Sequence, residues 1–502
     1  MEMFLGGLSD LFTSPSSILV LLAGLLGGLV FGAVPGVNLL TLAAIVLPFS
    51  VYLSPENAIM FFGVIYVAGV YGGAVTAILF NIPGSPENAP TAFDGYPMTR
   101  QGQAGRAIGA SVTASAVGGT LSCIAMMIAI EPVAYWAVRA FGPAEVFALV
   151  VFGLAMCATV GADSYWKGWL SVLAGMLLAT VGTEPTSGLT RFTFGTSFLS
   201  AGISFVALIL GLFAVSELFV QAHQLARRGR QAPHVHIDFP KIAEFWRMKG
   251  LVTRSTGIGF FAGVLPGVGA TLAAFLSYAF ALKTEKSDPP FGKGNIAGVV
   301  ASETSNNAAT ASALIPLLAL GLPGGALTAM MLGAFQMHGI DPGPLVFITS
   351  ANLVWMVFAA MFVANISILL LGYLETKTIV HLLRVPYGVL APFILLMSVI
   401  GAYSLRNLVI DVWVTLVAGI VGYFLRTTGY SIPGLVLGLI LGKIGEDNFV
   451  KTLQVIDYDP MGILDRPIAA TLLVFSLIAL IYGISRSMPW SGRARQSTVV
   501  AD

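Results

Sequence analysis

Long apolar stretches, separated by short polar loops, recur along the chain from Ile18 to Ile484. Many of them reach the roughly 20 residues that a helix needs to cross a bilayer. The pattern predicts apolar segments near residues 18–49, 57–81, 107–130, 143–161, 165–182, 198–221, 255–282, 295–320, 322–337, 344–373, 387–403, 407–425, 431–442 and 467–484. The shorter ones are expected as half-helices. We therefore predict an all-α polytopic membrane protein with about 10–14 membrane segments, including broken or re-entrant helices.

Composition supports a membrane protein and excludes several other classes. Of 502 residues, 56% are hydrophobic and only 10% are charged, whereas soluble domains carry about 25% charged residues. The net charge of +1 argues against a nucleic-acid partner. Cys123 and Cys157 both lie in apolar stretches and form neither a disulfide framework nor a metal motif.

A basic linker divides the chain into two halves. The stretch ARRGRQAPHVHIDFPKIAEFWRMKG is rich in arginine and lysine, which are enriched in cytoplasmic loops. The basic C-terminal tail is expected on the same side. We predict a first membrane repeat at 1–222, a cytoplasmic linker at 223–254, a second membrane repeat with C-terminal helices at 255–485, and a cytoplasmic tail at 486–502.

The two halves share two motifs. Residues 28–50 (GLVFGAVPGVNLLTLAAIVLPFS) and 259–281 (GFFAGVLPGVGATLAAFLSYAFA) both carry Gly-x-x-x-Gly-x-x-Pro-Gly-Val before a Thr-Leu-Ala-Ala run. Farther along, residues 72–85 (GGAVTAILFNIPGS) correspond to 306–325 (NNAATASALIPLLALGLPGG). Because the same motifs follow in the same order, they indicate an internal repeat.

Corresponding loops of the two halves carry opposite charge bias. After the first motif, VYLSPEN has neither Lys nor Arg, whereas KTEKSDPPFGKG has three lysines. After the second motif, MTRQGQAGR has two arginines, whereas HGIDPGP has neither residue. Since basic loops stay in the cytoplasm, equivalent loops are predicted on opposite sides of the membrane. Two inverted-topology repeats of this kind are a secondary-transporter architecture.

Four Pro-Gly pairs are expected to interrupt membrane helices, because proline removes a backbone donor and clashes with the preceding turn. They are Pro35-Gly36, Pro83-Gly84, Pro266-Gly267 and Pro323-Gly324. Irregular backbone at membrane depth is tolerated where protein or a watery cavity covers it. Freed carbonyls there can coordinate a cation, and freed amides at half-helix N-termini can attract an anion. The alternative interpretation is that these pairs only kink helices or lie in interfacial turns.

The most polar stretch in an apolar segment is SETSNNAATAS at 302–312. Its polar residues are Ser302, Glu303, Thr304, Ser305, Asn306, Asn307, Thr310 and Ser312. Because they would cover more than one face of a helix, we expect a partly unwound segment beside a cavity. Their oxygens and amides suit Na⁺, near Asn306, Asn307 and Thr310, or a carboxylate ligand. Glu303 is a candidate protonatable group or helix cap, or else an interfacial residue beside the Lys293 loop.

Candidate ligand residues in the first half surround the equivalent break. They are Thr76, Asn81, Ser85, Glu87 and Asn88, together with Asn38 beside the first Pro-Gly pair. Gly269 takes the place of Asn38 in the second half. The alternative is that NIPGSPENAP forms an exposed turn, since it is rich in turn-forming residues.

Several of these motifs together resemble the large membrane subunit of tripartite tricarboxylate transporters, the TctA family. They are GAVPGVNLLTLAAIVLP, YGGAVTAILFNIPGSPENAPTAFDGYPMTRQGQAGRAIG, GVLPGVGATLAAFLSY, FGKGNIAGVVASETSNNAATASALIPLLALGLPG and LVLGLILGKIGEDNF. The resemblance extends from about residue 18 to residue 480. It assigns the family's Pro-Gly signatures to Pro35, Gly36, Pro266 and Gly267, its NIPG signature to Asn81, Pro83 and Gly84, and its polar stretch to Glu303, Asn306 and Asn307.

The resemblance implies a secondary transporter of the bacterial inner membrane that imports tricarboxylates or related organic carboxylates. It further implies two partners, a small four-helix membrane subunit and a periplasmic solute-binding protein that delivers the substrate. Coupling to a gradient of Na⁺ or H⁺ is implied by the family and by none of the motifs derived above.

Other functional classes find less support in the sequence. None of the five histidines lies in a metal-binding motif such as H-E-x-x-H, and neither cysteine has a histidine nearby. We therefore expect no enzyme and no cofactor beyond the coupling ion. A G-x-x-x-x-G-K-[ST] phosphate loop is absent, which argues against a primary pump. A passive anion channel or permease without ion coupling is the alternative, because it would also use broken helices.

Overall fold

The computed structural model describes residues 2–34, 38–158, 164–184, 188–225, 242–265, 269–285, 288–382 and 387–487. The first half of the chain forms α1 (Glu2–Thr13), α2 (Pro15–Ala33), α3 (Leu39–Val46), η1 (Leu47–Tyr52), α4 (Pro55–Phe80), η2 (Pro86–Asn88), α5 (Ala89–Arg100), α6 (Ala104–Ala140), α7 (Pro143–Cys157), α8 (Tyr165–Ala179), β1 (Gly182–Thr183), β2 (Thr190–Arg191), α9 (Ser197–Ser200), α10 (Phe205–Ile209), η3 (Leu210–Val215) and α11 (Ser216–Leu225). The antiparallel β1–β2 ladder pairs Gly182 with Arg191.

The second half is also helical. It forms α12 (Ile242–Arg247), α13 (Lys249–Val264), α14 (Gly269–Thr284), α15 (Ile296–Ser312), α16 (Leu314–Leu320), α17 (Ala326–Met337), α18 (Val346–Thr349), α19 (Ala351–Leu382), α20 (Tyr387–Arg406), α21 (Val409–Thr427), α22 (Ile432–Val455), η4 (Pro460–Ile463) and α23 (Pro467–Ser487). Within the described ranges, this content confirms the predicted all-α class.

Seven helices among the described residues are long and apolar enough to cross a membrane. They are Pro15–Ala33, Pro55–Phe80, Ala104–Ala140, Phe205–Ala222, Ala351–Gly372, Val409–Thr427 and Pro467–Ser485. Shorter apolar helices cover Leu39–Tyr52, Pro143–Cys157, Ala326–Met337 and Leu390–Arg406. Long spans and short apolar helices therefore coexist, as the sequence predicts for a polytopic protein with broken segments; the total number of membrane segments stays a prediction.

The glycine motif of each half lets one helix pack closely on the next. A Cβ built on Gly32 of α2 would lie 2.5 Å from the carbonyl oxygen of Gly69 on α4. A Cβ built on Gly259 of α13 would lie 2.3 Å from the carbonyl oxygen of Ser305 on α15. Small residues allow such backbone contact between membrane helices. Thus α2 packs on α4 in the first half as α13 packs on α15 in the second.

The first helix of each pair, α2 or α13, ends just before a predicted break. Helix α2 ends at Ala33 and α3 begins at Leu39, while α13 ends at Val264 and α14 begins at Gly269. The intervening Pro35, Gly36, Pro266 and Gly267 lie outside the described residues.

The second pair of breaks has matching geometry in the two halves. Helix α4 ends on Asn81, whose backbone is left-handed at φ 57°. The Asn81 N–H donates to the Ala77 carbonyl, and the Ile82 N–H donates to the Thr76 carbonyl. Helix α16 ends on Gly321, left-handed at φ 71°, with the equivalent bonds to Leu317 and Pro316. Asn and Gly are the residues that adopt this conformation at helix ends. The match supports a repeat, and the inverted relation stays a prediction.

The polar stretch from Ser302 to Ser312 is helical throughout, so the expectation of a partly unwound segment is wrong. Helix α15 begins at Ile296, capped by the Asn295 side chain, and continues to Ser312. Glu303 lies near the middle of this 17-residue helix, so it caps neither end. Four hydroxyls of this helix donate to carbonyls three or four residues back and are satisfied without opening the backbone; they belong to Ser302, Ser305, Thr310 and Ser312.

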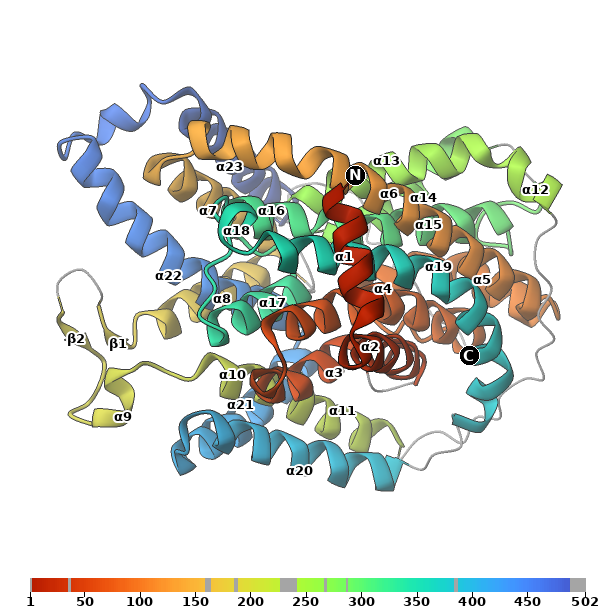
Figure 1. The fold of residues 1–502 in the computed structure, drawn as a ribbon, viewed down its shortest axis with the longest axis horizontal. Coiled ribbons are helices and arrows are strands. Elements are labelled where there is room, and N and C mark those ends of the chain that lie inside the picture. Colours follow the sequence, from red (N-terminus) through yellow and green to blue (C-terminus); the bar gives the residue numbers. More distant parts are fainter. Residues whose placement is uncertain are drawn as a thin grey trace.

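Loops with the same predicted location lie beside each other in the fold. His338 Nε2 is 3.2 Å from the Ser50 carbonyl oxygen, which joins two loops predicted as periplasmic. Gln101 donates to the Lys293 carbonyl at 2.9 Å, which joins two loops predicted as cytoplasmic. Figure 1 shows α12, the end of the basic linker, and the β1–β2 hairpin at opposite ends of the longest dimension. The helix α13 already begins at Lys249, within the predicted linker.

Candidate functional site

One face of α15 carries the acidic and amide side chains of the polar stretch. At 100° per residue, Glu303, Asn306, Asn307 and Thr310 fall on the same side of the helix. All four residues are completely buried. A helix with this many buried polar groups is a candidate functional element, because burying a polar group without a partner is costly.

The carboxylate of Glu303 is held by hydroxyls from the other half of the chain. Thr91 Oγ1, on α5, donates to Glu303 Oε1, and Ser115 Oγ, on α6, donates to Oε2 at 3.0 Å. Helix α5 follows the first-half break directly, so that break places Thr91 against α15. The contact therefore joins α15 of the second half to α5 and α6 of the first half.

The short helix η2 brings a second carboxyl group to the same interface. The carbonyl oxygen of Glu87 accepts from Asn306 Nδ2 at 3.4 Å. The Glu87 side chain accepts from Thr271 Oγ1, on α14, at 3.5 Å. Residues after the first-half break thus contact both long helices that follow the second-half Pro-Gly-Val motif.

Ser85 and Asn88 stabilise the backbone between the break and α5. Ser85 Oγ donates to Asn88 Oδ1 at 2.7 Å, and Asn88 Nδ2 donates to the Val70 carbonyl of α4 at 2.9 Å. Both side chains are buried. The Gly84 N–H bonds the Gly73 carbonyl at 3.2 Å, which folds the break back onto α4. The conformation of the NIPGSPEN segment is therefore fixed by hydrogen bonds within it and to α4.

The two breaks differ in exposure. Asn81 and Pro83 are exposed, whereas Pro323 and Gly324 are buried. Thr76, near the first break, is buried and donates to the Gly73 carbonyl at 3.1 Å. The first break is therefore more exposed than the second.

Four polar atoms of α15 are buried and have no hydrogen-bond partner among the described residues. They are Thr304 Oγ1, Asn306 Oδ1, Asn307 Oδ1 and Asn307 Nδ2. Leaving a buried polar group unpaired costs about 1–3 kcal/mol. Such a group in a native protein points to a ligand, an ion or an ordered water that pairs with it. Asn307, with both amide atoms free, is the clearest candidate.

The remaining predicted residues are already engaged. Ser305 donates to the Ala301 carbonyl at 3.0 Å, and Thr310 donates to the Asn307 carbonyl at 2.8 Å. Asn38 caps α3, since its Oδ1 accepts from the Thr41 N–H at 2.9 Å. Gly269, its counterpart, begins α14. Asn38 and Gly269 therefore begin equivalent helices, and the ligand role predicted for them has no contact to support it.

Several site residues were missed from the sequence because each is a lone small polar residue in an apolar helix. Thr91 and Ser115 bind Glu303 as described above. Ser122 Oγ, on α6, donates to the Ala308 carbonyl of α15 at 2.5 Å. A Cβ on Gly118 would lie 2.3 Å from the Thr304 carbonyl oxygen. The signal was a run of small residues every three or four positions along α6, which marks the face that packs on α15.

A separate acidic residue fixes the loop before α15. Asp94 Oδ1, on α5, accepts backbone N–H bonds from Gly292, Gly294 and Asn295 at 2.8, 3.0 and 2.8 Å. Its Oδ2 accepts from Tyr278 Oη, on α14, at 2.9 Å. Both oxygens are used within the protein, so Asp94 positions α5, α14 and α15 relative to one another.

The donor set of the α15 face suits hard ions and polar organic ligands. Amide and hydroxyl oxygens bind Na⁺, and the amide nitrogen of asparagine donates to a carboxylate. Clusters of three or more His, Cys, Asp or Glu that could hold a metal ion do not occur in the part of the chain that the structure describes. The arrangement can therefore bind and release an ion or a carboxylate through neutral groups, with one carboxyl group beside them.

Comparison with known proteins agrees with the motifs. The family model of the tripartite tricarboxylate transporter TctA family matches residues 18–437. An uncharacterized 52.8 kDa protein in the TAR-I ttuC' 3'region of Agrobacterium vitis is 35% identical over 475 residues, covering 95% of this chain and 94% of the relative. An uncharacterized protein in the TAR-II ttuC' 3'region of the same organism is 36% identical over 230 residues, covering 46% of this chain and 95% of that relative. No solved structure matches the chain.

Proposed function

Because this chain belongs to the tripartite tricarboxylate transporter TctA family, we propose that it is an ion-gradient-driven secondary transporter that imports tricarboxylates or related organic carboxylates. It is a component of a tripartite transporter. Its partners in the proposal are a small four-helix membrane subunit and a periplasmic solute-binding protein, and its location is the bacterial inner membrane.

The observation that carries this proposal is the set of unpaired polar atoms on α15. Asn306 and Asn307 keep amide atoms without partners in a helix that lies wholly inside the protein. A purely structural helix would replace these side chains by apolar ones, since each unpaired group costs about 1–3 kcal/mol. A transported ligand that binds in one conformation and leaves in another accounts for groups that are paired only part of the time.

The position of these atoms supports transport. They lie where α15 of the second half meets α5, α6 and η2 of the first half. Transporters built from two repeats bind substrate and coupling ion between the repeats, because rocking of one against the other exposes that site to each side in turn. In this proposal Asn306, Asn307 and Thr310 hold the cation or the carboxylate. Glu303 is the protonatable group if the coupling ion is H⁺.

We test the proposal by uptake into vesicles that contain all three subunits, with Na⁺ and proton gradients imposed separately. Accumulation of a carboxylate above its external concentration supports secondary transport, and the gradient that drives it identifies the coupling ion. Flux that only follows the carboxylate's own gradient would favour the alternative, a passive anion channel. Vesicles without the small membrane subunit are expected to lose uptake.

The site itself is tested by Asn306→Ala and Asn307→Ala. Removing an amide that pairs with an ion or substrate costs about 1–3 kcal/mol, which corresponds to roughly a tenfold or greater rise in half-saturation for that ligand. Asn448→Ala is the matched control, because Asn448 lies on α22 and donates to the Ile444 carbonyl of its own helix at 2.8 Å. If both site variants keep normal half-saturation at equal membrane expression, the α15 face is structural and the binding site lies elsewhere.

A further inference from the structure

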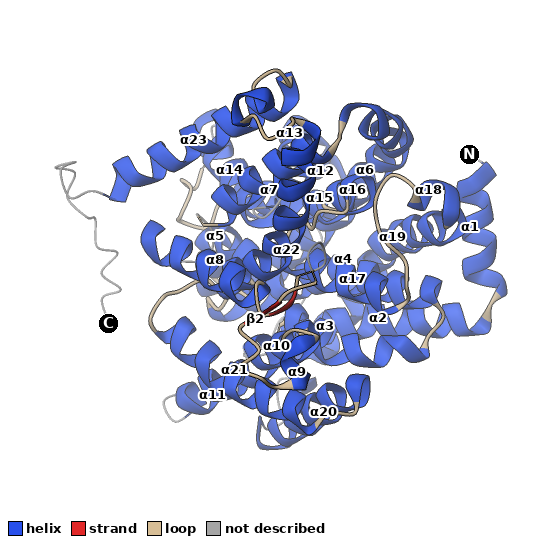
Figure 2. Cartoon of the chain, turned by 90° about the vertical axis from the view of Figure 1, so that its left-hand side faces the viewer, coloured by secondary structure: helices blue, strands red, loops and turns tan. Residues whose placement is uncertain are grey.

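A cavity of about 530 Å³ lies away from the α15 face, between the β1–β2 hairpin and helices α8, α17 and α22. Sites for small ligands typically measure about 300–1,000 Å³. Viewed from the end of the molecule that carries the hairpin, the elements that line it surround the middle of the structure (Figure 2). The cavity includes Lys443 and Glu446 of the LGKIGEDNF motif, a motif to which the proposed transport site assigns no role.

Four charged residues line the cavity, and two of them neutralise each other. Arg191 forms a two-pronged ion pair with Glu446, with Nη1 to Oε1 at 2.5 Å and Nη2 to Oε2 at 3.1 Å. Because both oxygens of Glu446 accept from Arg191, this carboxylate offers little to a further cation. The other two charged residues are Lys443 and Asp341, both exposed.

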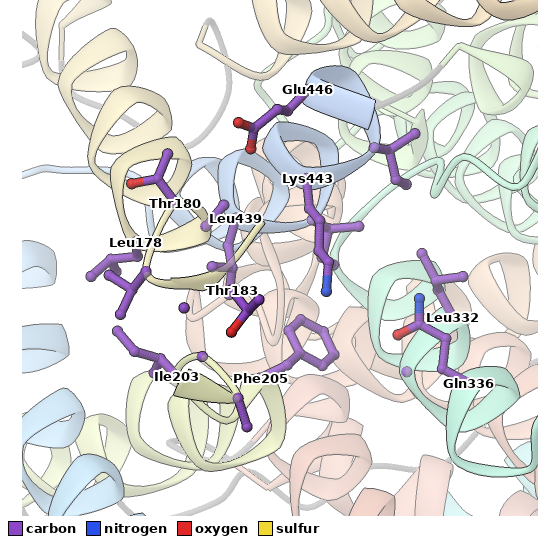
Figure 3. Close-up of a pocket in the computed structure, with 18 of the residues that line it drawn as sticks. Leu178, Thr180, Thr183, Ile203, Phe205, Leu332, Gln336, Leu439, Lys443 and Glu446 are labelled. Atoms are coloured by element: carbon purple, nitrogen blue, oxygen red, sulfur yellow. The ribbon is translucent and has the colours of Figure 1, made fainter. Parts of the chain in front are cut away.

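Lys443 is a cation without a partner in the described part of the chain. No carboxylate oxygen lies within 4.0 Å of its ammonium group, and it donates no hydrogen bond there. Figure 3 shows its side chain extending from α22 into the cavity, toward the space between Thr183 and Gln336. The amide of Gln336, at the end of α17, points into the same space. The lysine ammonium on α22 can donate to an anion in this space, and the Gln336 amide on α17 can supply a second donor when its nitrogen faces that anion.

A loop that borders the cavity is predicted on the side of the membrane from which substrate would arrive. Gln336 and Asp341 lie on either side of the loop that contains Gly339, which carries no Lys or Arg and is predicted as periplasmic. His338 in the same loop contacts the Ser50 carbonyl, in the other loop predicted as periplasmic.

We propose that this cavity is a receiving site for the organic carboxylate, in which Lys443 and Gln336 bind one carboxylate group before the substrate moves to the α15 face. The proposal rests on the transport function proposed above and adds a second, outer site to it. The positive charge of Lys443 attracts the anion. The Arg191–Glu446 ion pair also lines the cavity but contributes no net charge. Asp341 is the one acid among the described cavity-lining residues without an ion-pair partner, so it opposes anion binding and limits its affinity.

The test uses a cysteine reporter in the cavity. In Thr183→Cys, a cavity position that leaves both Lys443 and Gln336 intact, a membrane-impermeant thiol reagent added outside right-side-out vesicles should label the new cysteine. The native Cys123 and Cys157 are buried. Citrate, malate and succinate are the probes, each added before the reagent. We expect at least one to slow labelling about tenfold, and the protection to be lost when Lys443→Gln is added. Thr193→Cys, outside the cavity, should show no protection.

Uptake by the complete transporter provides the second readout. Lys443→Gln should raise the half-saturation for carboxylate about tenfold or more while Lys443→Arg keeps it near normal, and Asp341→Asn should lower it. Lys451→Gln is the matched control, since Lys451 lies on the same helix and is paired with Asp447 at 2.6 Å. Protection should persist in Asn307→Ala, because the outer site fills first. Absence of protection by all three probes overturns the receiving site whether or not uptake occurs, whereas protection without uptake upholds it and contradicts the transport proposal.

Discussion

The buried carboxylate of Glu303 shows how single residues connect the two halves of the molecule. Its oxygens accept from Thr91 on α5 and Ser115 on α6. Thr91→Val removes one donor without changing the side-chain shape, and should destabilise the fold by about 1–3 kcal/mol because the carboxylate loses a partner. The expected measurement is a lower midpoint of thermal unfolding in detergent.

A double-mutant cycle separates this contact from general damage to the helix. Combined with Glu303→Gln, the Thr91→Val change should cost less than it does alone, since contacting residues couple by about 0.5–3 kcal/mol. Thr113→Val is the control, because Thr113 donates to the Gly109 carbonyl of its own helix at 2.7 Å. Strictly additive effects of Thr91→Val and Glu303→Gln would mean that the bond contributes nothing.

Among single residues, the sequence identified the carboxyl and amide side chains of the site but not its hydroxyl side chains. Glu303, Asn306 and Asn307 are conspicuous in an apolar segment, so the sequence pointed to them correctly as buried interior residues of interest. Thr91 and Ser115 could not be found in this way, since hydroxyls in membrane helices commonly bond their own backbone. The packing of α5 and α6 on α15 determines which hydroxyl groups donate to the Glu303 carboxylate.

At the scale of elements, the helix breaks are defined by backbone contacts that leave no room for a side chain. A Cβ on Gly84 would lie 2.5 Å from Gly73 Cα and 2.7 Å from the Gly32 carbonyl oxygen. Gly84→Ala should therefore push the break away from α2 and α4, with a cost of about 1–3 kcal/mol. The change should lower both the unfolding midpoint and the uptake rate, because the break positions η2 and α5.

Gly257→Ala is the matched control for that substitution. Gly257 lies inside α13, and a Cβ there meets nothing within 4 Å. It should stabilise the helix by up to about 1 kcal/mol, since alanine favours helix more than glycine does. Equal behaviour of the two variants would show that the contacts of Gly84 do not constrain the break.

The sequence predicted the positions of the breaks better than the conformation between them. Proline and glycine act on their own backbone, so the ends of α4 and α16 follow from local chemistry. Asn81 and Gly321 correspond because both residue types adopt the left-handed conformation. The continuous helix at 302–312 was mispredicted because the outcome depends on partners from α5, α6 and η2, which supply contacts for polar groups that an isolated helix would expose.

At the scale of the whole molecule, matching elements do not have matching surroundings. The Asn81–Gly84 break is exposed at Asn81 and Pro83, whereas the equivalent Pro323 and Gly324 are buried. Inverted repeats that exchange two conformations would give each repeat a different accessibility at any one time. The asymmetry thus supports the proposed transport cycle, in which the second conformation would expose the Pro323–Gly324 break and bury the first.

The inverted arrangement itself makes a prediction about membrane sidedness. Accessibility tags at Pro55 and Gly339 should report the periplasm, and tags at Gly102 and Pro289 should report the cytoplasm. The reason is that Lys and Arg gather in the second pair of loops and avoid the first. Each pair also lies together in the fold, through His338 with Ser50 and Gln101 with Lys293.

The measurement is labelling of single introduced cysteines at these four positions by a membrane-impermeant reagent, in intact cells and in inverted vesicles. A cysteine at Gly250, near the Arg106–Glu244 ion pair that joins α6 to α12, is the cytoplasmic reference. Labelling of Gly102 and Gly339 from the same side would exclude inverted repeats, because these loops follow equivalent breaks. It would also remove the reason for placing the α15 face between two halves that move relative to each other. Alternating access by this mechanism therefore depends on the predicted topology.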